Sequence, residues 1–250
     1  MGEDGPLDRT EDFKEIHLDD TFAFSCHPGM ACFNACCRDL NQFLTPYDIL
    51  RLKGNQKLTS QRFLERYTLR HIGPRSGLPI VALKMVYEED LRCPFVSPQG
   101  CTVYEDRPGS CRTYPLGRMA RRKPNGRGSE ESYFLIKEAH CLGFDESRQW
   151  TVRDWKRDQK LSIYNEMNDL VMEVLALKNR SGRDRLTQSE NDLFCMAFYD
   201  MDRFRDFTFE KRLWQGSENP EDVLEAIQED DVALLSFAIA WVKDALFGRD

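Results

Sequence analysis

Cysteine is the residue type in this sequence that could do chemistry, because a thiolate binds soft and borderline metal ions. The chain has nine cysteines, and only Cys195 lies beyond residue 141. The other eight form a candidate set of metal ligands: Cys26, Cys32, Cys36, Cys37, Cys93, Cys101, Cys111 and Cys141. Free cysteines rarely crowd in this way for packing alone, so metal or redox chemistry is the leading interpretation.

The spacing of these cysteines bears on the choice of metal. Five residues separate Cys26 from Cys32, and three separate Cys32 from the adjacent pair Cys36 and Cys37. The repeated two-residue spacing of zinc ribbons is absent from the sequence. Wider and irregular spacing suits loops that wrap a larger object, so an iron–sulfur cluster, of the 4Fe–4S type, is favoured over zinc.

Eight thiols are enough for two four-sulfur sites. Adjacent side chains tend to point apart, so Cys36 and Cys37 either serve different sites or include one residue that is not a ligand. The sequence leaves the pairing of ligands open. Cys195 is different, because it lies between Phe194 and Met196 on a predicted helix and is expected to be a buried structural thiol.

Two arginines lie close to the cysteines in sequence. Arg112 follows Cys111 directly, and Arg107 lies four residues before it. A site of several thiolates is negatively charged, so guanidinium donors near sulfur would stabilise it, and we predict cofactor-binding roles for Arg107 and Arg112. His27 and His140 each adjoin a cysteine and are expected at the surface or beside a ligand. No catalytic residue can be assigned.

The elements that must position these residues differ between the two halves of the chain. We predict an acidic tail at residues 1–20, a cysteine-rich metal-binding region with short strands at 21–144, and a helical region packed on it at 145–250. The fold class expected is therefore α+β. One compact unit is favoured over two, because a small metal-binding region has little core of its own.

Caps and periodicity predict the individual elements. Thr45 before Pro46 predicts a helix over 46–53, and the pairs Thr151 with Asp154 and Thr187 with Glu190 predict two further helix starts. The predicted helices cover 46–53, 60–70, about 151–178, about 187–204 and the stretch around 232–242. The predicted strands are 79–87, 102–104 and 132–137, with an exposed loop or hairpin tip at 121–131.

Charge and hydropathy narrow the function classes. The net charge of −7 argues against nucleic-acid binding, which depends mainly on Lys and Arg. No stretch approaches the roughly 20 apolar residues that span a bilayer. The acidic first 20 residues are unlike a signal peptide, so a cytoplasmic protein without a membrane partner is expected, and a protein partner is left open.

Several short motifs together resemble the YkgJ-type cysteine-cluster family, whose members are described as zinc- or iron-chelating proteins. The matching runs are Phe24-Ser25-Cys26, Cys36-Cys37-Arg38, Leu44-Thr45-Pro46-Tyr47-Asp48, Cys93-Pro94-Phe95, Gly100-Cys101-Thr102-Val103-Tyr104 and the run from Arg107 to Pro115. The gaps around Cys32 are longer than the usual opening of the family. The resemblance covers about residues 22–141 and implies a metal or iron–sulfur centre. A branch containing the flagellin lysine N-methylases shares the cysteine cluster.

Three functions follow from these observations. The first is an iron–sulfur protein with a redox or electron-transfer role, and the second is a zinc-stabilised protein-interaction module. The third is a protein-modifying enzyme of the lysine-methylating kind, which would need a nucleotide-like cofactor pocket. The nearest match to such a pocket, Gly126-Arg127-Gly128, lies in a charged segment that is better interpreted as a hairpin tip.

Overall fold

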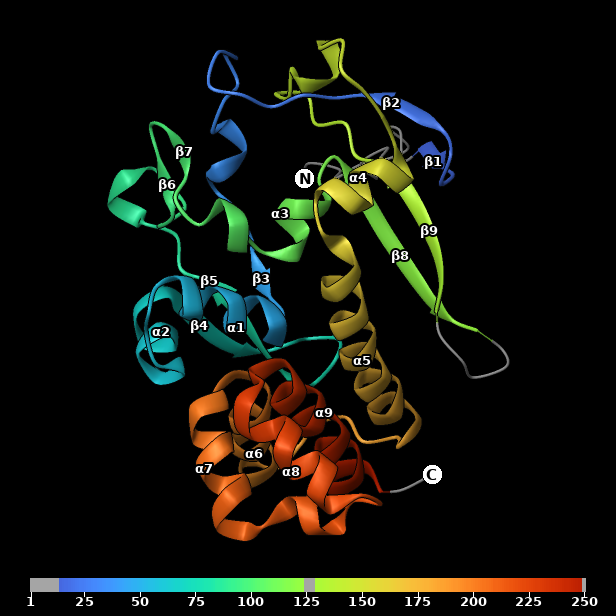
Figure 1. Cartoon of the computed structure of the whole chain (residues 1–250). Helices are drawn as coiled ribbons and strands as arrows, with labels where there is room; N and C mark the ends of the chain where they lie inside the picture. Colours follow the sequence, from blue (N-terminus) through green and yellow to red (C-terminus); the bar gives the residue numbers. More distant parts are fainter. Residues whose placement is uncertain (1–13, 124–128, 249–250) are drawn as a thin grey trace, which may run out of the picture. The chain divides into compact units, whose positions relative to one another are not determined.

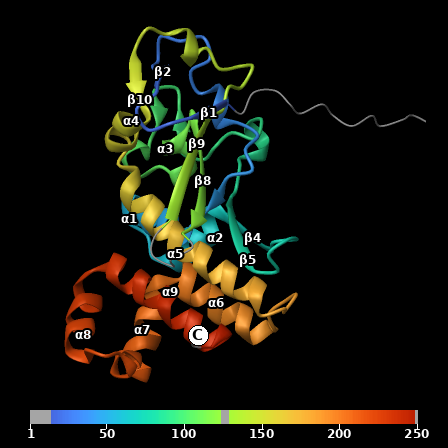
Figure 2. The ribbon, with the colours of Figure 1, turned by 90° about the vertical axis from the view of Figure 1, so that its right-hand side faces the viewer.

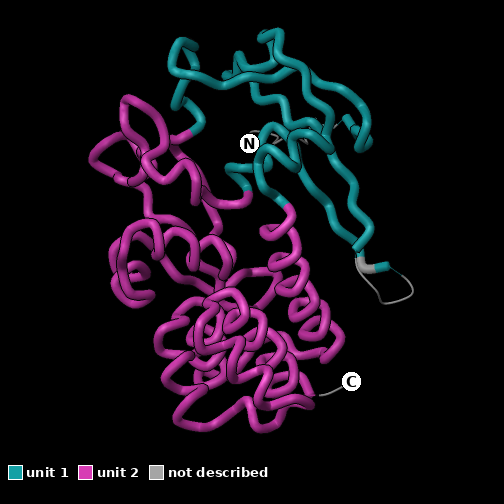
Figure 3. The backbone as a smooth tube through the Cα atoms, in the orientation of Figure 1, with its two compact units in different colours: residues 1–36, 110–161 teal, residues 37–109, 162–250 magenta. Residues whose placement is uncertain are grey.

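The computed structural model describes residues 14–123 and 129–248. The chain divides into two compact units, each assembled from two separate stretches of sequence (Figure 3). Unit 1 comprises residues 1–36 and 110–161, and unit 2 comprises residues 37–109 and 162–250. One boundary therefore falls between the adjacent Cys36 and Cys37, and the cysteine-rich region contributes to both units.

Unit 1 contains two small antiparallel sheets and short helices (Figure 1). One sheet has the strand order β1-β9-β8, and the other pairs β2 with β10. The strands are β1 (Lys14–Ile16), β2 (Thr21–Ala23), β8 (Leu116–Arg122), β9 (Ser129–Leu135) and β10 (Gln149–Thr151), and the helices are α3 (Gly109–Thr113), which begins at the boundary, and α4 (Val152–Asp158). Both sheets join the first stretch of the unit to the second, so strand pairing closes unit 1.

Aromatic side chains form the core of unit 1. Phe22 and Phe24 pack edge-on against Trp155, with ring centroids 6.0 and 5.6 Å apart. The indole nitrogen of Trp155 donates to the carbonyl oxygen of Thr113 at 3.1 Å, which satisfies the one polar atom of this buried ring. Gly143 lies so close to Phe24 that a Cβ atom would come within 2.6 Å of its ring, so this position requires glycine.

Unit 2 is mainly helical and has a larger core. A three-stranded antiparallel sheet of order β3-β5-β4 and the two-stranded pair β6-β7 accompany the helices. Figure 2 shows α6 to α9 gathered in one bundle, and α9 contacts each of the other three. The elements are β3 (Phe43–Leu44), α1 (Pro46–Asn55), α2 (Ser60–Tyr67), β4 (Thr68–Ile72), β5 (Pro79–Leu83), β6 (Val96–Ser97), β7 (Gly100–Cys101), α5 (Leu161–Arg180), α6 (Gln188–Tyr199), α7 (Met201–Lys211), α8 (Pro220–Glu229) and α9 (Asp231–Phe247).

The predicted α+β class, with short strands in the N-terminal region and a C-terminal helical region, is confirmed. The helix starts are confirmed too, because Thr45, Thr151 and Thr187 each accept a hydrogen bond from the backbone N–H three residues later. The segment at 121–131 connects β8 to β9, as a hairpin should, although residues 124–128 and therefore Gly126-Arg127-Gly128 lie outside the described residues. Most of the predicted acidic tail, residues 1–13, also lies outside them, and residues 14–16 form β1.

The lengths of several elements were predicted wrongly. The long helix over 151–178 is two helices, because Lys160 adopts a left-handed conformation at φ 53° between α4 and α5. The helix over 187–204 is also two, since Asp200 ends α6 and caps the start of α7. Trp155 and Leu161, on the two sides of Lys160, both lie in the core of unit 1, whereas Tyr164 and the later apolar residues of α5 lie in the core of unit 2. Periodicity along the chain does not show this change of core.

Three further differences concern local elements. The predicted helix over 60–70 ends at Tyr67, and residues 68–72 pair with β5 as β4. The predicted strand at 102–104 is wrong, because the strand lies at β7 and a 3-10 turn follows at Tyr104–Asp106. Helix α8 lies in an acidic run and was not predicted, although Ile227 in this helix is buried.

Candidate metal centre

The eight candidate ligands are divided between the two units. Unit 1 contains Cys26, Cys32, Cys36, Cys111 and Cys141, and unit 2 contains Cys37, Cys93 and Cys101. The adjacent Cys36 and Cys37 thus belong to different units, and whether they serve different sites stays a prediction.

In unit 1, three other thiols lie near enough to that of Cys26 to affect its pKa. The pKa of Cys26 is raised to about 11, first because burial disfavours the thiolate, and then because ionised Cys36, Cys32 and Cys141 would repel its charge. Mutual repulsion of this kind arises only among thiols that are close together. A bound cation would reverse the effect, because it stabilises every thiolate around it. We call Cys26, Cys32, Cys36 and Cys141 the unit 1 thiol group.

Backbone contacts bring this group together from distant parts of the chain. The N–H of Ser25 donates to the carbonyl oxygen of Gly143 at 3.0 Å, which fixes the residue before Cys26 next to the loop after Cys141. The N–H of Leu142 donates to Cys32 Sγ at 3.3 Å. An N–H donor to sulfur stabilises a thiolate and orients a ligand, so this contact suits a metal site.

In unit 2, the loop after Cys37 and the β6-β7 pair hold the other three thiols. The backbone N–H of Cys93 donates to the carbonyl oxygen of Cys37 at 2.9 Å. Cys101 lies in β7 and pairs with Val96 of β6. Val96 in turn follows Cys93 by three residues, so the pairing brings Cys101 near Cys93. We call Cys37, Cys93 and Cys101 the unit 2 thiol group.

Opposing effects act on the thiol of Cys93. Burial raises its pKa most, and the negative charge of an ionised Cys101 adds to the rise. The backbone N–H groups of Phe95 and Val96 donate toward its sulfur and lower the pKa, as does the charge of Arg92. Two N–H donors from the residues just after a cysteine favour the thiolate, which is the form that binds metal.

The donor chemistry of both groups fits a soft metal, but the thiols do not yet stand in coordinating positions. Among residues 14–123 and 129–248, no three His, Cys, Asp or Glu side chains converge closely enough to hold an ion as they stand. The thiols would therefore have to draw together on binding. Coupling of this kind is common, since a metal site is rarely preformed in its absence.

Three of the predicted site residues lie outside the two thiol groups. Cys111 is exposed in α3 and stays a predicted ligand. Arg107 is buried, lies 3.6 Å over the ring of Tyr104 and donates to the carbonyl oxygen of that residue. Arg112 is also buried and donates to the carbonyl oxygen of Gln159 at 3.0 Å. These contacts show both arginines stabilising the local backbone, and their contact with a cofactor stays a prediction.

The remaining candidates lie where the sequence suggested. His27 and His140 are about half exposed and face Glu146 and Glu138 at 3.6 and 3.7 Å. Cys195 is buried in α6, as expected for a structural thiol, and its pKa is raised mainly by burial.

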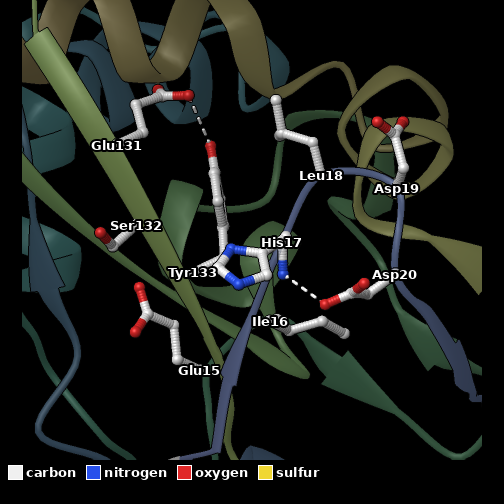
Figure 4. Close-up of a pocket in the computed structure, with 9 residues that line it drawn as sticks. All are labelled: Glu15, Ile16, His17, Leu18, Asp19, Asp20, Glu131, Ser132 and Tyr133. Atoms are coloured by element: carbon white, nitrogen blue, oxygen red, sulfur yellow. Dashed lines mark hydrogen bonds between the residues drawn. The ribbon is translucent and has the colours of Figure 1, made fainter.

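A cavity of about 410 Å³ in unit 1 is lined by residues that were not predicted as site residues (Figure 4). Its lining includes no described cysteine, and Glu131 and Tyr133 form one wall. The Tyr133 hydroxyl donates to Glu131 at 3.0 Å, as the dashed line shows, and Lys156 donates to the same carboxylate at 2.5 Å. Burial alone would raise the pKa of Glu131, but Lys156 and Arg118 outweigh it and hold the pKa below its ordinary value.

Sequence reasoning missed two features of these thiol groups. One is the pair of N–H donors to Cys93, for which the Cys93-Pro94-Phe95 step was the available signal. The other is Tyr114, whose hydroxyl faces Cys141 within unit 1. Its signal was its place three residues after Cys111 in the run from Arg107 to Pro115.

Thiols with backbone N–H donors to sulfur have the chemistry that soft or borderline metal ions prefer. The comparison with family models agrees. Residues 25–147 match the CxxCxxCC model, described as a "putative zinc- or iron-chelating domain", and this region of the chain belongs to that family. The family supports metal binding in general and confirms the resemblance inferred from the motifs.

No curated protein and no solved structure is detectably similar to the chain. Within the described part of the chain, no helix is both long and apolar enough to cross a membrane.

Proposed function

We propose that this protein binds iron as an iron–sulfur cluster through the unit 1 thiol group and has a redox or electron-transfer role. The observation that carries the proposal is that burial, together with the three nearby thiols Cys36, Cys32 and Cys141, raises the pKa of Cys26. Four thiolates from one unit are the usual number for a cluster or for zinc. The wide, irregular spacing of the cysteines favours the larger cluster.

The unit 2 thiol group is proposed as a second binding site, with three ligands from unit 2. The N–H groups of Phe95 and Val96 support Cys93 as a ligand, because they stabilise its thiolate. A cluster, when bound, supplies one-electron transfer, and the residues of this chain hold it and tune its potential through donors to sulfur. The proposal requires reduced thiols, so we place the function in a reducing compartment.

The experiment is a metal analysis of the full chain purified without oxygen. We expect a brown protein with broad visible absorption and with iron and acid-labile sulfide in matching amounts. Stoichiometric zinc in a colourless protein would contradict the iron assignment and favour a zinc-stabilised interaction module instead. Absence of any bound or reconstituted metal would contradict metal binding altogether.

Variants assign the ligands. Cys26→Ser should lose the metal of unit 1, because it removes the central thiol of that group. Cys93→Ser should lose only the metal of unit 2. Cys195→Ser is the matched control, since this thiol is buried in α6 outside both groups, and it should retain full metal content. Retention of all metal by Cys26→Ser would overturn the unit 1 assignment.

A further inference from the structure

A second cavity, of about 460 Å³, lies within unit 2. Its size falls in the range typical of small-molecule pockets, about 300–1,000 Å³. The end of α2, the strands β4 and β5, helix α6 and the start of α7 all contribute to its lining. The lining includes none of the eight candidate metal ligands among the residues that the structure describes.

One wall of this cavity consists of buried side chains. Val81 of β5 and Met196 and Tyr199 of α6 line the cavity and are all buried. The Tyr199 hydroxyl donates to the carbonyl oxygen of Pro79 at 3.3 Å, so the polar atom of this ring has its partner within the protein. The wall therefore offers mainly apolar surface to a ligand, and burying an apolar group against it is favourable.

Two guanidinium groups line the same cavity from separate elements. Arg70 lies in β4, beside the thiol of Cys195, and Arg203 lies in the first turn of α7. Within the described part of the chain neither side chain forms an ion pair, whereas Arg205 of the same helix α7 pairs with Asp231. Two guanidinium groups without carboxylate partners favour an anionic ligand group, and their planar donors suit a carboxylate.

Two carboxylates limit which anion the cavity can hold. Asp192 and Asp200 also line it, so the charges of the two arginines and the two aspartates cancel. Asp200 Oδ1 accepts the backbone N–H of Arg203 at 3.3 Å, and Asp192 Oδ1 accepts from Gln188 at 3.0 Å, which leaves the second oxygen of each for a ligand. These carboxylates would repel a multiply charged anion such as phosphate and would attract an ammonium group.

We propose that this cavity binds a free α-amino acid with an apolar side chain. Arg70 and Arg203 hold its carboxylate, Asp192 and Asp200 hold its ammonium group, and the buried wall contacts its side chain. A peptide carries these two charges at opposite ends, so the neutral balance of charges in one small cavity favours the free amino acid. The inference does not depend on the proposed function, because it uses no metal ligand.

The test is a calorimetric titration of the full chain, as purified, with three ligands that share one apolar group. L-Leucine carries both charges, isocaproate lacks the ammonium group, and isoamylamine lacks the carboxylate. We expect leucine to bind with one site per chain and each analogue to bind at least about tenfold more weakly, because it loses charge-assisted hydrogen bonds.

Variants of the arginines test the carboxylate contacts. Arg70→Gln and Arg203→Gln should each weaken leucine binding about tenfold, because each removes a charged donor. Arg62→Gln is the matched control, since Arg62 is exposed in α2, lies outside the cavity lining and removes the same charge from the chain. It should leave the affinity for leucine unchanged.

A further variant tests the ammonium contact. Asp200→Asn keeps a side chain that can cap α7, so the fold should be preserved, and thermal unfolding checks this. The variant should weaken leucine binding and should bind isocaproate at least as well as wild type, because one repelling carboxylate is gone.

The outcomes decide the proposal without involving the metal. Absence of leucine binding by wild type would overturn it, and so would equal binding of leucine and isocaproate or tighter binding of inorganic phosphate. An equal loss in Arg62→Gln and Arg203→Gln would also overturn it, because the effect would then be one of overall charge. The metal content of the arginine variants should equal that of wild type, so failure here leaves the proposed function standing.

Discussion

Unit 1 has five cysteines around a small core, whereas unit 2 has four cysteines and a much larger core. Among the described residues, eight buried apolar side chains form the core of unit 1 and twenty-eight form that of unit 2. Stability from burial grows with the apolar surface removed from water, so a small unit has little to offset its chain entropy. Under the proposed function, we therefore expect metal binding to contribute more to the stability of unit 1 than to that of unit 2.

Metal removal should therefore have the largest effect, and mainly on unit 1. Chelation of the bound metal under reducing conditions should destabilise unit 1 on the order of several kcal/mol, because binding energy contributes directly to its folding. Hydrogen exchange measures this region by region, and the amides of β8 and β9 should lose protection while those of α6 and α9 keep it. Equal loss of protection in both units would contradict the comparison.

The converse prediction concerns the core of unit 2. Leu235 in α9 is fully buried, and Leu235→Ala should cost about 2–5 kcal/mol because it leaves a cavity. Urea unfolding measures the loss, and the metal content of the native protein should stay at the wild-type value. Met172→Ala is the control, since Met172 is 47% exposed and should change stability little. If Leu235→Ala lost the unit 1 metal, the two units would not be independent.

The polar contacts of unit 1 should give it a pH-dependent stability. The pKa of Glu131 is lowered, so the folded state favours its ionised form, and this stabilisation is present above the ordinary pKa of 4.5 and is lost as the pH falls below it. Glu131→Gln should cost about 1–2 kcal/mol at pH 7, allowing for partial exposure of the pair with Lys156. Thermal unfolding at several pH values measures it. The gap between variant and wild type should narrow in acid, and a gap independent of pH would show that ionisation is not the cause.

The smallest effect is expected at a helix cap in unit 2. Thr187 and Glu190 form a capping box at the start of α6, and Thr187→Ala should cost about 1 kcal/mol. Denaturant unfolding would detect this as a lower midpoint with an unchanged slope. Ser162→Ala, at an exposed position in the first turn of α5, is the control and should change the midpoint little.

Local signals allowed part of this fold to be predicted, and long-range pairing determined the rest. The helix starts at Thr45, Thr151 and Thr187 could be found because a cap involves residues only three apart. The breaks at Lys160 and Asp200 could not, because the apolar pattern continues across both of them while the backbone leaves the helical conformation.

The same distinction holds for the candidate site. Cysteine type and spacing identified the thiols, because metal affinity is a property of the side chain. Their grouping depends on contacts such as the one from Ser25 to Gly143, across more than a hundred residues. Tyr114 could be found only once the burial of its hydroxyl was known.

The interleaving of the two units has a consequence for how the chain is made. Cys26, Cys32 and Cys36 leave the ribosome more than a hundred residues before Cys141, and β1 and β2 are synthesised long before their partners β9 and β10. The first stretch of unit 2, residues 37–109, is synthesised after these three cysteines and before Cys141. The first three thiols of the unit 1 thiol group are therefore present before the fourth. Under the proposed function, unit 1 can bind its metal through all four thiols only after Cys141 has been synthesised, which would make metal binding a late step of folding.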